Sequence, residues 1–203
     1  MQEFENPKKF THFKIHTQYS ICEGALKIDE LNTHCKKNKI LSIGISDTSN
    51  LCGALEFSEK ITKSGAQPII GTQIIFKFED QEGLLTLIAK NERGYRNMIE
   101  LSSKSYLENN NLSKPHCKLT DLLKKNEGLI IMSGTINGLI GNLFNKGKFE
   151  LIDDIYKNLK KHYNDNFYIE IQRHSDKDEK SFEKFNLNLS LKHNIPIIAS
   201  HEV

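Results

Sequence analysis

Short apolar runs alternate along the chain with stretches in which apolar residues recur every three or four positions. The run GLIIM at 128–132 is typical of a strand buried on both faces, whereas Ile28, Leu31 and Cys35 fall on one side of a helix. The pattern predicts strands at 10–16, 41–46, 73–79, 84–89, 128–132, 167–172 and 195–199. It predicts helices at 28–37, 54–63, 95–107, 120–125, 151–162 and 180–193.

This alternation indicates an α/β fold whose sheet is parallel and covered by helices on both faces. Repeating strand–helix units of this number favour a closed barrel over a doubly wound sheet. The sequence contains no solenoid-type repeat and no linker rich in Pro or Gly, so we expect residues 1–203 to form a single domain. The chain stops just after its last predicted strand, without a helix to cover it, so we expect an N-terminal fragment of a longer protein.

Composition narrows the class of protein. With 203 residues and 37% hydrophobic content the chain can bury a core, which excludes wholesale disorder. The formal net charge of +2 excludes binding to nucleic acid by bulk positive charge alone. Only Arg93, Arg96 and Arg173 among the 28 basic residues are arginine, which argues against a dedicated phosphate-reading surface.

Three features that the sequence lacks indicate the cellular compartment of the protein. No apolar run reaches the ~18 residues of a membrane span, and residues 1–9 do not resemble a secretory signal. Cys22, Cys35, Cys52 and Cys117 show no CxxC spacing, which favours free thiols over a disulfide framework or a zinc knuckle. We therefore expect a cytoplasmic protein without membrane partners.

Polar residues that could bind a metal gather at the predicted strand ends. His12, Lys14 and His16 alternate along the first strand and so point to one side of it. Directly after later strands come Asp47, His174, His201 and Glu202. Because catalytic groups of parallel barrels lie past the carboxyl ends of the strands, a metal site is one interpretation. The alternative is a set of ordinary polar loop residues.

Eight short segments form an ordered set of motifs. They are FTHFKIHTQYS (10–20), ISDTSNLCGALEF (45–57), PIIGTQ (68–73), LTLIAKN (85–91), GYRN (94–97), EGLIIMSG (127–134), FYIEIQRH (167–174) and IIASHEV (197–203). This set resembles the PHP domain, the polymerase and histidinol phosphatase family. It is most similar to the branch found at the N-terminus of bacterial DNA polymerase III alpha subunits. The resemblance implies a distorted (β/α)7 barrel, C-terminally truncated.

The resemblance also implies where metal ligands would lie. Active members of the family are metal-dependent phosphoesterases with a cluster of ions bound by His, Asp, Glu and Cys at the C-terminal barrel face. This chain keeps His16, Asp47 and His174, and has Glu202 in place of an Asp. At the remaining ligand positions, which are His, His, Glu, His and Cys in the family, it has Lys14, Thr48, Gln73, Leu84 and Thr135.

The replacement by Lys14 matters most for the chemistry. A protonated lysine offers three hydrogen-bond donors and no lone pair, so its ammonium repels a divalent ion and stands in for the ion's charge. We expect this ammonium to pair with Asp47 or Glu202. With only two carboxylates left among the ligand positions, we expect no multinuclear cluster, no catalytic residue and no cofactor in this fragment.

One metal site stays open as an alternative, a single weakly held ion near His16, Asp47 and His174.

The leading hypothesis for function is a degenerate, non-hydrolytic PHP domain of a DNA polymerase III alpha chain. The resemblance implies that it supports the remainder of the alpha chain and docks the separate proofreading exonuclease subunit. DNA contact and DNA-directed DNA polymerase activity, a nucleotidyl transfer, would belong to the full enzyme in DNA replication.

Two other functions compete with this one. The first is an active metal-dependent phosphoesterase or 3′–5′ exonuclease, in which His16, Asp47, His174 and Glu202 hold zinc or manganese that activates a water. The second is a small-molecule barrel enzyme unrelated to replication.

Overall fold

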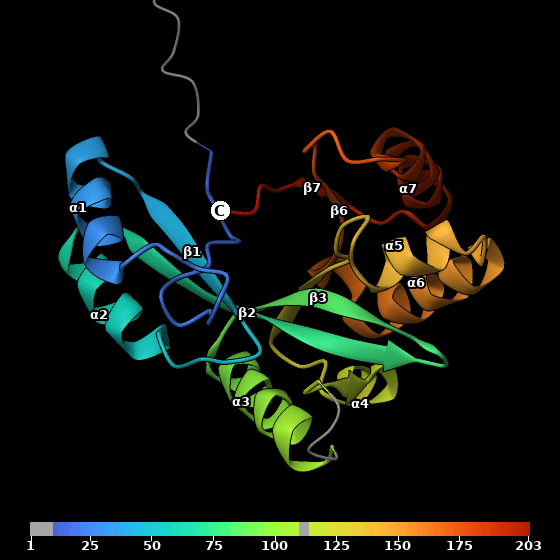
Figure 1. Cartoon of the computed structure of the whole chain (residues 1–203), viewed down its shortest axis with the longest axis horizontal. Coiled ribbons are helices and arrows are strands. Elements are labelled where there is room, and N and C mark those ends of the chain that lie inside the picture. The colour runs from blue at the N-terminus through green and yellow to red at the C-terminus, as the bar shows by residue number, and fades with distance from the viewer. Residues whose placement is uncertain (1–9, 110–113) are drawn as a thin grey trace, which may run out of the picture.

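The computed structural model describes residues 10–109 and 114–203 (Figure 1). The segment 1–9, from which we inferred that a secretory signal is absent, lies outside this part. Among the described helices, none is long and apolar enough to cross a membrane.

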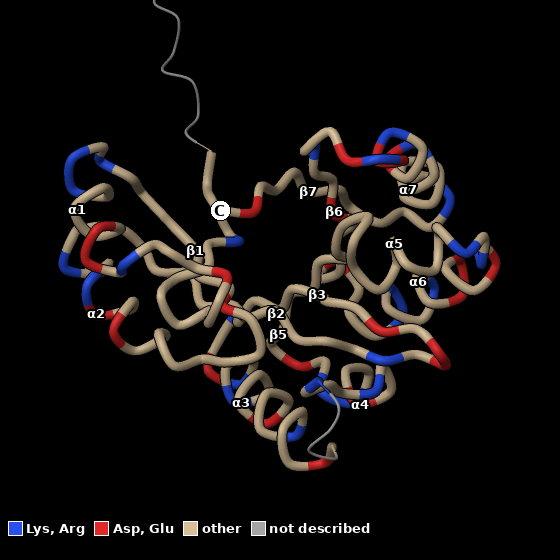
Figure 2. Tube along the Cα trace, in the orientation of Figure 1, with Lys and Arg blue, Asp and Glu red and all other residues tan. Residues whose placement is uncertain are grey.

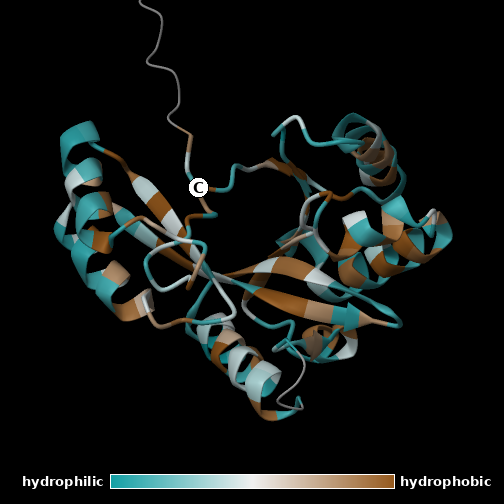
Figure 3. Ribbon diagram, in the orientation of Figure 1, coloured by the Kyte–Doolittle hydropathy of each residue, from teal (hydrophilic) through white to brown (hydrophobic). Residues whose placement is uncertain are grey.

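A curled, seven-stranded mixed sheet forms the centre of the molecule (Figure 1). The strands are β1 (Ser42–Thr48), β2 (Gln67–Phe78), β3 (Gln81–Ala89), β4 (Cys117–Lys118), β5 (Leu129–Met132), β6 (Phe167–Ile171) and β7 (Ile197–Ala199). Their order is β1-β2-β3-β5-β6-β7, and β4 pairs with β2. The strands are rich in apolar residues, as Figure 3 shows for β1, β2 and β3.

The expected all-parallel sheet is wrong at β3, which runs antiparallel to both β2 and β5. The reason is the connection between β2 and β3, which consists of Glu79 and Asp80 alone. A turn this short can join only antiparallel strands, and Glu79 adopts a positive φ of 52° to make it. Strand β2 begins at Gln67, whereas the prediction began it at residue 73. The prediction missed the first part of the strand because Pro68 and Gly71 interrupt the pattern of β-forming residues.

Seven α-helices cover the sheet in the described part of the chain. They are α1 (Ile28–Asn38), α2 (Ala54–Lys63), α3 (Glu92–Leu107), α4 (Leu119–Lys124), α5 (Leu139–Asn145), α6 (Phe149–Tyr163) and α7 (Glu179–His193). Figure 1 shows α1 and α2 flanking β1, and α5, α6 and α7 at the opposite side near β6 and β7. Acidic and basic residues are interspersed along these helices in the view of Figure 2.

Helix α5 is absent from the sequence prediction. Leu139, Ile140 and Leu143 are all buried, so the short segment lacks the polar face that gives a helix its periodic signature. The other six helices were predicted, with ends shifted by up to three residues. Their apolar faces fill two clusters, one beneath α1 and α2 and a larger one beneath α3 to α7.

The strand predicted at 10–16 is irregular and forms only isolated backbone bonds, yet residues 12–16 occupy a strand position. They lie between β1 and the C-terminal residues, and so join the two ends of the curled sheet. The bonds are Gly44 N to His12 O (2.7 Å), Ser46 N to Ile15 O (2.9 Å), Val203 N to Lys14 O (3.0 Å) and His16 N to Val203 O (2.9 Å). The predicted distorted (β/α) barrel is therefore confirmed, with its ring completed by an irregular segment.

The close approach of this segment to β1 depends on Gly44. A Cβ at that position would lie 2.8 Å from the Cα of Phe13, a distance that real Cβ atoms do not adopt. Only glycine allows the two backbones to meet here.

Candidate functional site

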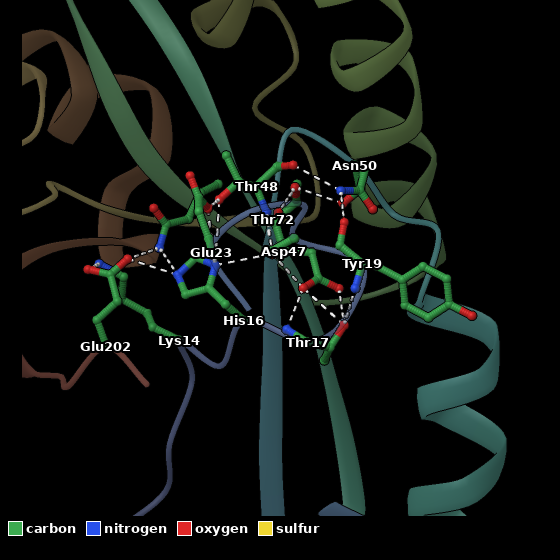
Figure 4. Close-up of polar contacts among 12 residues, drawn as sticks. Lys14, His16, Thr17, Tyr19, Glu23, Asp47, Thr48, Asn50, Thr72 and Glu202 are labelled. Atoms are coloured by element: carbon green, nitrogen blue, oxygen red, sulfur yellow. Dashed lines mark hydrogen bonds and ion pairs between the residues drawn. The ribbon is translucent and has the colours of Figure 1, made fainter. Parts of the chain in front are cut away.

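A cavity of about 340 Å³ opens at the carboxyl ends of β5, β6 and β7. Of the nine positions that the sequence analysis singled out, six line it: Lys14, Gln73, Leu84, Thr135, His174 and Glu202. The other three, His16, Asp47 and Thr48, belong to the polar network beside it (Figure 4). The topology thus brings six of the nine positions to one cavity from residues spread over the whole chain.

Lys14 is the cation of this cavity. Its Nζ lies 3.1 Å from Oε1 of Glu170 and 3.4 Å from Oε2 of Glu202. Only 3% of the Lys14 side chain and 0% of the Glu170 side chain are exposed, against 36% for Glu202. The predicted pairing with Glu202 is confirmed, while Asp47, the other candidate partner, is bound elsewhere.

Glu170 is the functional residue that sequence reasoning missed. It lies in the middle of β6 between Ile169 and Ile171, where a carboxylate has no solvent to face. The sequence did contain a signal, a charged residue inside an otherwise apolar strand. Because buried charges in proteins are paired, this residue could have been predicted to have a cationic partner. Its Oε1 also accepts hydrogen bonds from Gln172 Nε2 (3.0 Å) and from the Ser200 hydroxyl.

Glu202 bonds to three donors from two parts of the barrel, the 12–16 segment and β2 (Figure 4). His16 Nε2 lies 2.9 Å and Gln73 Nε2 2.7 Å from its Oε1, and Lys14 faces its Oε2. Burial alone would raise the pKa of Glu202, but the bonds from His16 and Gln73 and the charge of Lys14 lower it to about 2. Glu202 is therefore an anion whose lone pairs are used by the protein's own donors.

Asp47 is satisfied by the loop that follows the 12–16 segment (Figure 4). Its carboxylate accepts the backbone N–H of Thr17 at 2.7 Å, the Thr17 hydroxyl at 2.8 Å and the Ser20 hydroxyl at 2.7 Å. It is 1% exposed. A buried carboxylate with this many donors fixes the loop, and its lone pairs face inward rather than into the cavity.

Thr48, at a position where the resemblance implies a histidine, donates a hydrogen bond to Glu23 Oε2. Glu23 Oε2 also lies 3.9 Å from Nδ1 of His16, and Ser20 Oγ lies 3.3 Å from the same nitrogen. Both ring nitrogens of His16 thus face protein oxygens, Nδ1 on this side and Nε2 towards Glu202.

His174 lies across the cavity and belongs to a separate group. Its Nε2 lies 3.1 Å from Oε1 of Gln172, and its ring stacks on that of His201 with centroids 4.5 Å apart. Its backbone N–H donates to Glu179 at 2.8 Å. These bonds tie His174 to the start of α7 rather than to His16 or Asp47.

The residues present do not fit a metal cluster. Across residues 10–109 and 114–203, no group of three or more His, Cys, Asp or Glu side chains has the arrangement to hold an ion. The candidate set His16, Asp47 and His174 is not assembled, and the Lys14 ammonium lies between the carboxylates of Glu170 and Glu202. A single weakly bound ion, which would need the site to rearrange, stays a prediction.

A model of the PHP domain matches residues 12–174. The chain belongs to the PHP domain family. It is 33% identical over 202 residues to DNA polymerase III subunit alpha of Caulobacter vibrioides, and 35% identical over 205 residues to that of Borreliella burgdorferi. These matches confirm the predicted resemblance to DNA polymerase III alpha subunits. Each covers 96% of this chain but 18% of the relative, so this PHP domain spans less than a fifth of those proteins.

Solved structures show the same fold at low sequence identity. A metal-dependent phosphoesterase from Bifidobacterium adolescentis superposes with a TM-score of 0.64 at 12% identity, covering 97% of this chain and 88% of that one. An amidohydrolase from Chromobacterium violaceum with bound sulfate gives a TM-score of 0.59 at 10% identity, covering 95% and 86%. These structural similarities support the PHP-type barrel fold and do not show an activity.

Proposed function

We propose that this PHP domain is a non-hydrolytic scaffold of a DNA polymerase III alpha chain, in which Lys14 takes the place of catalytic metal ions. The observation that carries the proposal is the buried ammonium of Lys14, held between Glu170 and Glu202 inside the cavity. A fixed cation at this point offsets part of the negative charge of the two carboxylates without a dissociable ion.

The donors around Glu202 support the same conclusion. A divalent ion that used Glu202 as a ligand would have to displace the Lys14 ammonium and the donors of His16 and Gln73. Lys14 cannot serve as a ligand while protonated, and it repels the incoming charge. Binding would therefore have to offset both the repulsion and the broken hydrogen bonds.

Membership of the alpha chain rests on relatives named DNA polymerase III subunit alpha at 30–35% identity over 96% of this chain. In this proposal the remainder of the alpha chain performs DNA-directed DNA polymerisation in the cytoplasm and contacts DNA. The PHP domain supports that chain and docks the proofreading exonuclease subunit.

Metal analysis combined with an activity assay tests the scaffold role. The purified chain is incubated with zinc or manganese, desalted and measured for bound metal. Hydrolysis of bis(p-nitrophenyl) phosphate and of a 3′-labelled DNA strand is then followed. We expect less than stoichiometric metal and no hydrolysis above the His16→Ala variant. Near-stoichiometric metal together with hydrolysis that His16→Ala abolishes would establish the active phosphoesterase instead.

The docking role has its own test. The full alpha chain and the purified proofreading exonuclease subunit are mixed, and complex formation is measured by size-exclusion chromatography and calorimetry. We expect a complex that is lost when the PHP domain is removed from the alpha chain. A complex of unchanged affinity without the PHP domain would contradict docking at this domain and leave the metal result intact.

A further inference from the structure

Two buried polar atoms on facing elements have no hydrogen-bond partner among the described residues. They are Oε2 of Glu170, on β6, and Nδ2 of Asn186, on α7. Both residues are almost fully buried, at 2% and 1% exposure. An unpaired carboxylate oxygen and an unpaired amide N–H inside a protein each carry a large desolvation penalty, so such groups usually have a partner.

The neighbouring donors are already used. Tyr156 donates its single hydroxyl hydrogen to Oδ1 of Asn186 at 2.9 Å. Gln172 and Ser200 donate to Oε1 of Glu170, as does Lys14. In this arrangement Oδ1 of Asn186 accepts from the Tyr156 hydroxyl, and Nδ2 is left as the donor without a partner.

A small cavity of about 10 Å³ is lined by both Glu170 and Asn186. It lies between β6 and α7, the elements that carry the two unpaired atoms. This is about the volume that a single water needs, and the cavity walls supply polar groups.

We propose that one buried water occupies this cavity, accepting a hydrogen bond from Nδ2 of Asn186 and donating one to Oε2 of Glu170. Water suits the pair because it is small and is both donor and acceptor. A metal cation is disfavoured because the amide N–H groups of Asn186 offer no lone pair, and an anion is disfavoured by the Glu170 carboxylate.

The water makes Asn186 a positioning residue for the cation site. With Oε2 held from the α7 side, Glu170 keeps the orientation in which its Oε1 meets Lys14 at 3.1 Å. The inference deepens the proposed function, because it explains how the carboxylate that binds Lys14 is held. It rests on the contacts around Glu170 alone, so a metal-loaded, active protein would overturn the scaffold role and leave the water in place.

A crystal structure of the chain at a resolution that shows ordered water tests the site directly. We expect one density peak within about 2.7–3.2 Å of both Glu170 Oε2 and Asn186 Nδ2. A direct hydrogen bond between the two side chains, a cavity without density, or a peak surrounded by short oxygen contacts as in a cation site would each overturn the proposal.

A matched pair of variants tests the positioning role. Asn186→Leu removes the donor and fills the cavity, whereas Asn188→Leu makes the same change at an exposed position of α7. We expect Asn186→Leu to shift the carboxyl carbon resonance of Glu170 in ¹³C NMR, and Asn188→Leu to leave it unchanged. Equal resonances in both variants would refute the role of Asn186. If Asn186→Leu does not fold, the density in the unmodified protein decides alone.

Discussion

Replacing Lys14 by methionine tests the cation site most directly. Methionine keeps the length and much of the volume of the side chain, so the change removes the ammonium while leaving the packing similar. Glu170 then stays in the interior as a carboxylate without its cation, and Glu202 loses one of three donors.

The magnitude follows from the burial of the partners. Removing one member of a buried ion pair costs about 3–5 kcal/mol, because the other charge is left uncompensated. Glu170 keeps its bonds from Gln172 and Ser200, and Glu202 is a third exposed and screened by water, so the lower end applies. We expect Lys14→Met to lower the free energy of unfolding by about 3 kcal/mol, and the melting temperature by about 6–12 °C.

Urea unfolding followed by far-UV circular dichroism measures the effect. Lys148→Met is the matched control, because Lys148 also faces two carboxylates, Glu79 and Asp80, but at the surface. We expect no measurable change in its unfolding midpoint. The double variant Lys14→Met/Glu170→Gln removes both charges, and we expect it to regain about 1–2 kcal/mol relative to Lys14→Met alone.

The reasoning would be refuted by a loss below about 1 kcal/mol in Lys14→Met, which is the range of surface pairs. It would also be refuted if the double variant were less stable than Lys14→Met, because removal of the unpaired charge would then bring no relief.

Three further predictions follow from the same contacts. The pKa of Glu202 falls from 4.5 to about 2 on folding, so the stability that its carboxylate contributes is complete above pH 4.5 and is lost as pH drops towards 2. The unfolding free energies of wild type and Glu202→Gln should therefore converge over that range, and a constant difference between them would contradict this. Asp47→Ala leaves buried donors unpaired and should cost roughly 3 kcal/mol in urea unfolding, whereas the exposed Asp165→Ala should change nothing. Gly44→Ala forces a methyl against Phe13 and should cost about 1–3 kcal/mol while speeding hydrogen exchange at the β1 edge; unchanged exchange would exclude the clash.

Local periodicity predicted most helices and strands because it depends on neighbours in sequence. The apolar spacing of Ile28, Leu31 and Cys35, all buried in α1, is one such case. The same signal failed for α5, which has no polar face. It also failed between β2 and β3, where a two-residue turn sets the strand direction.

The candidate site was predictable only as a set of positions. The ordered motifs placed Lys14, Gln73 and Glu202 at one end of the barrel, and the structure brings them to one cavity. The motifs did not reveal which group each one bonds to. Asp47 was a candidate partner for Lys14, yet it binds the Thr17 loop, and the partner that was missed is Glu170.

The sequence by itself determined the family and most of the secondary structure, since both depend on residue identity and short-range spacing. Only the tertiary structure decided that Lys14 meets Glu170 and that residues 12–16 join β1 to the C-terminal segment. These contacts connect residues as far apart in the sequence as Lys14 and Val203. Their geometry is set by how the curled sheet closes, which no local pattern records.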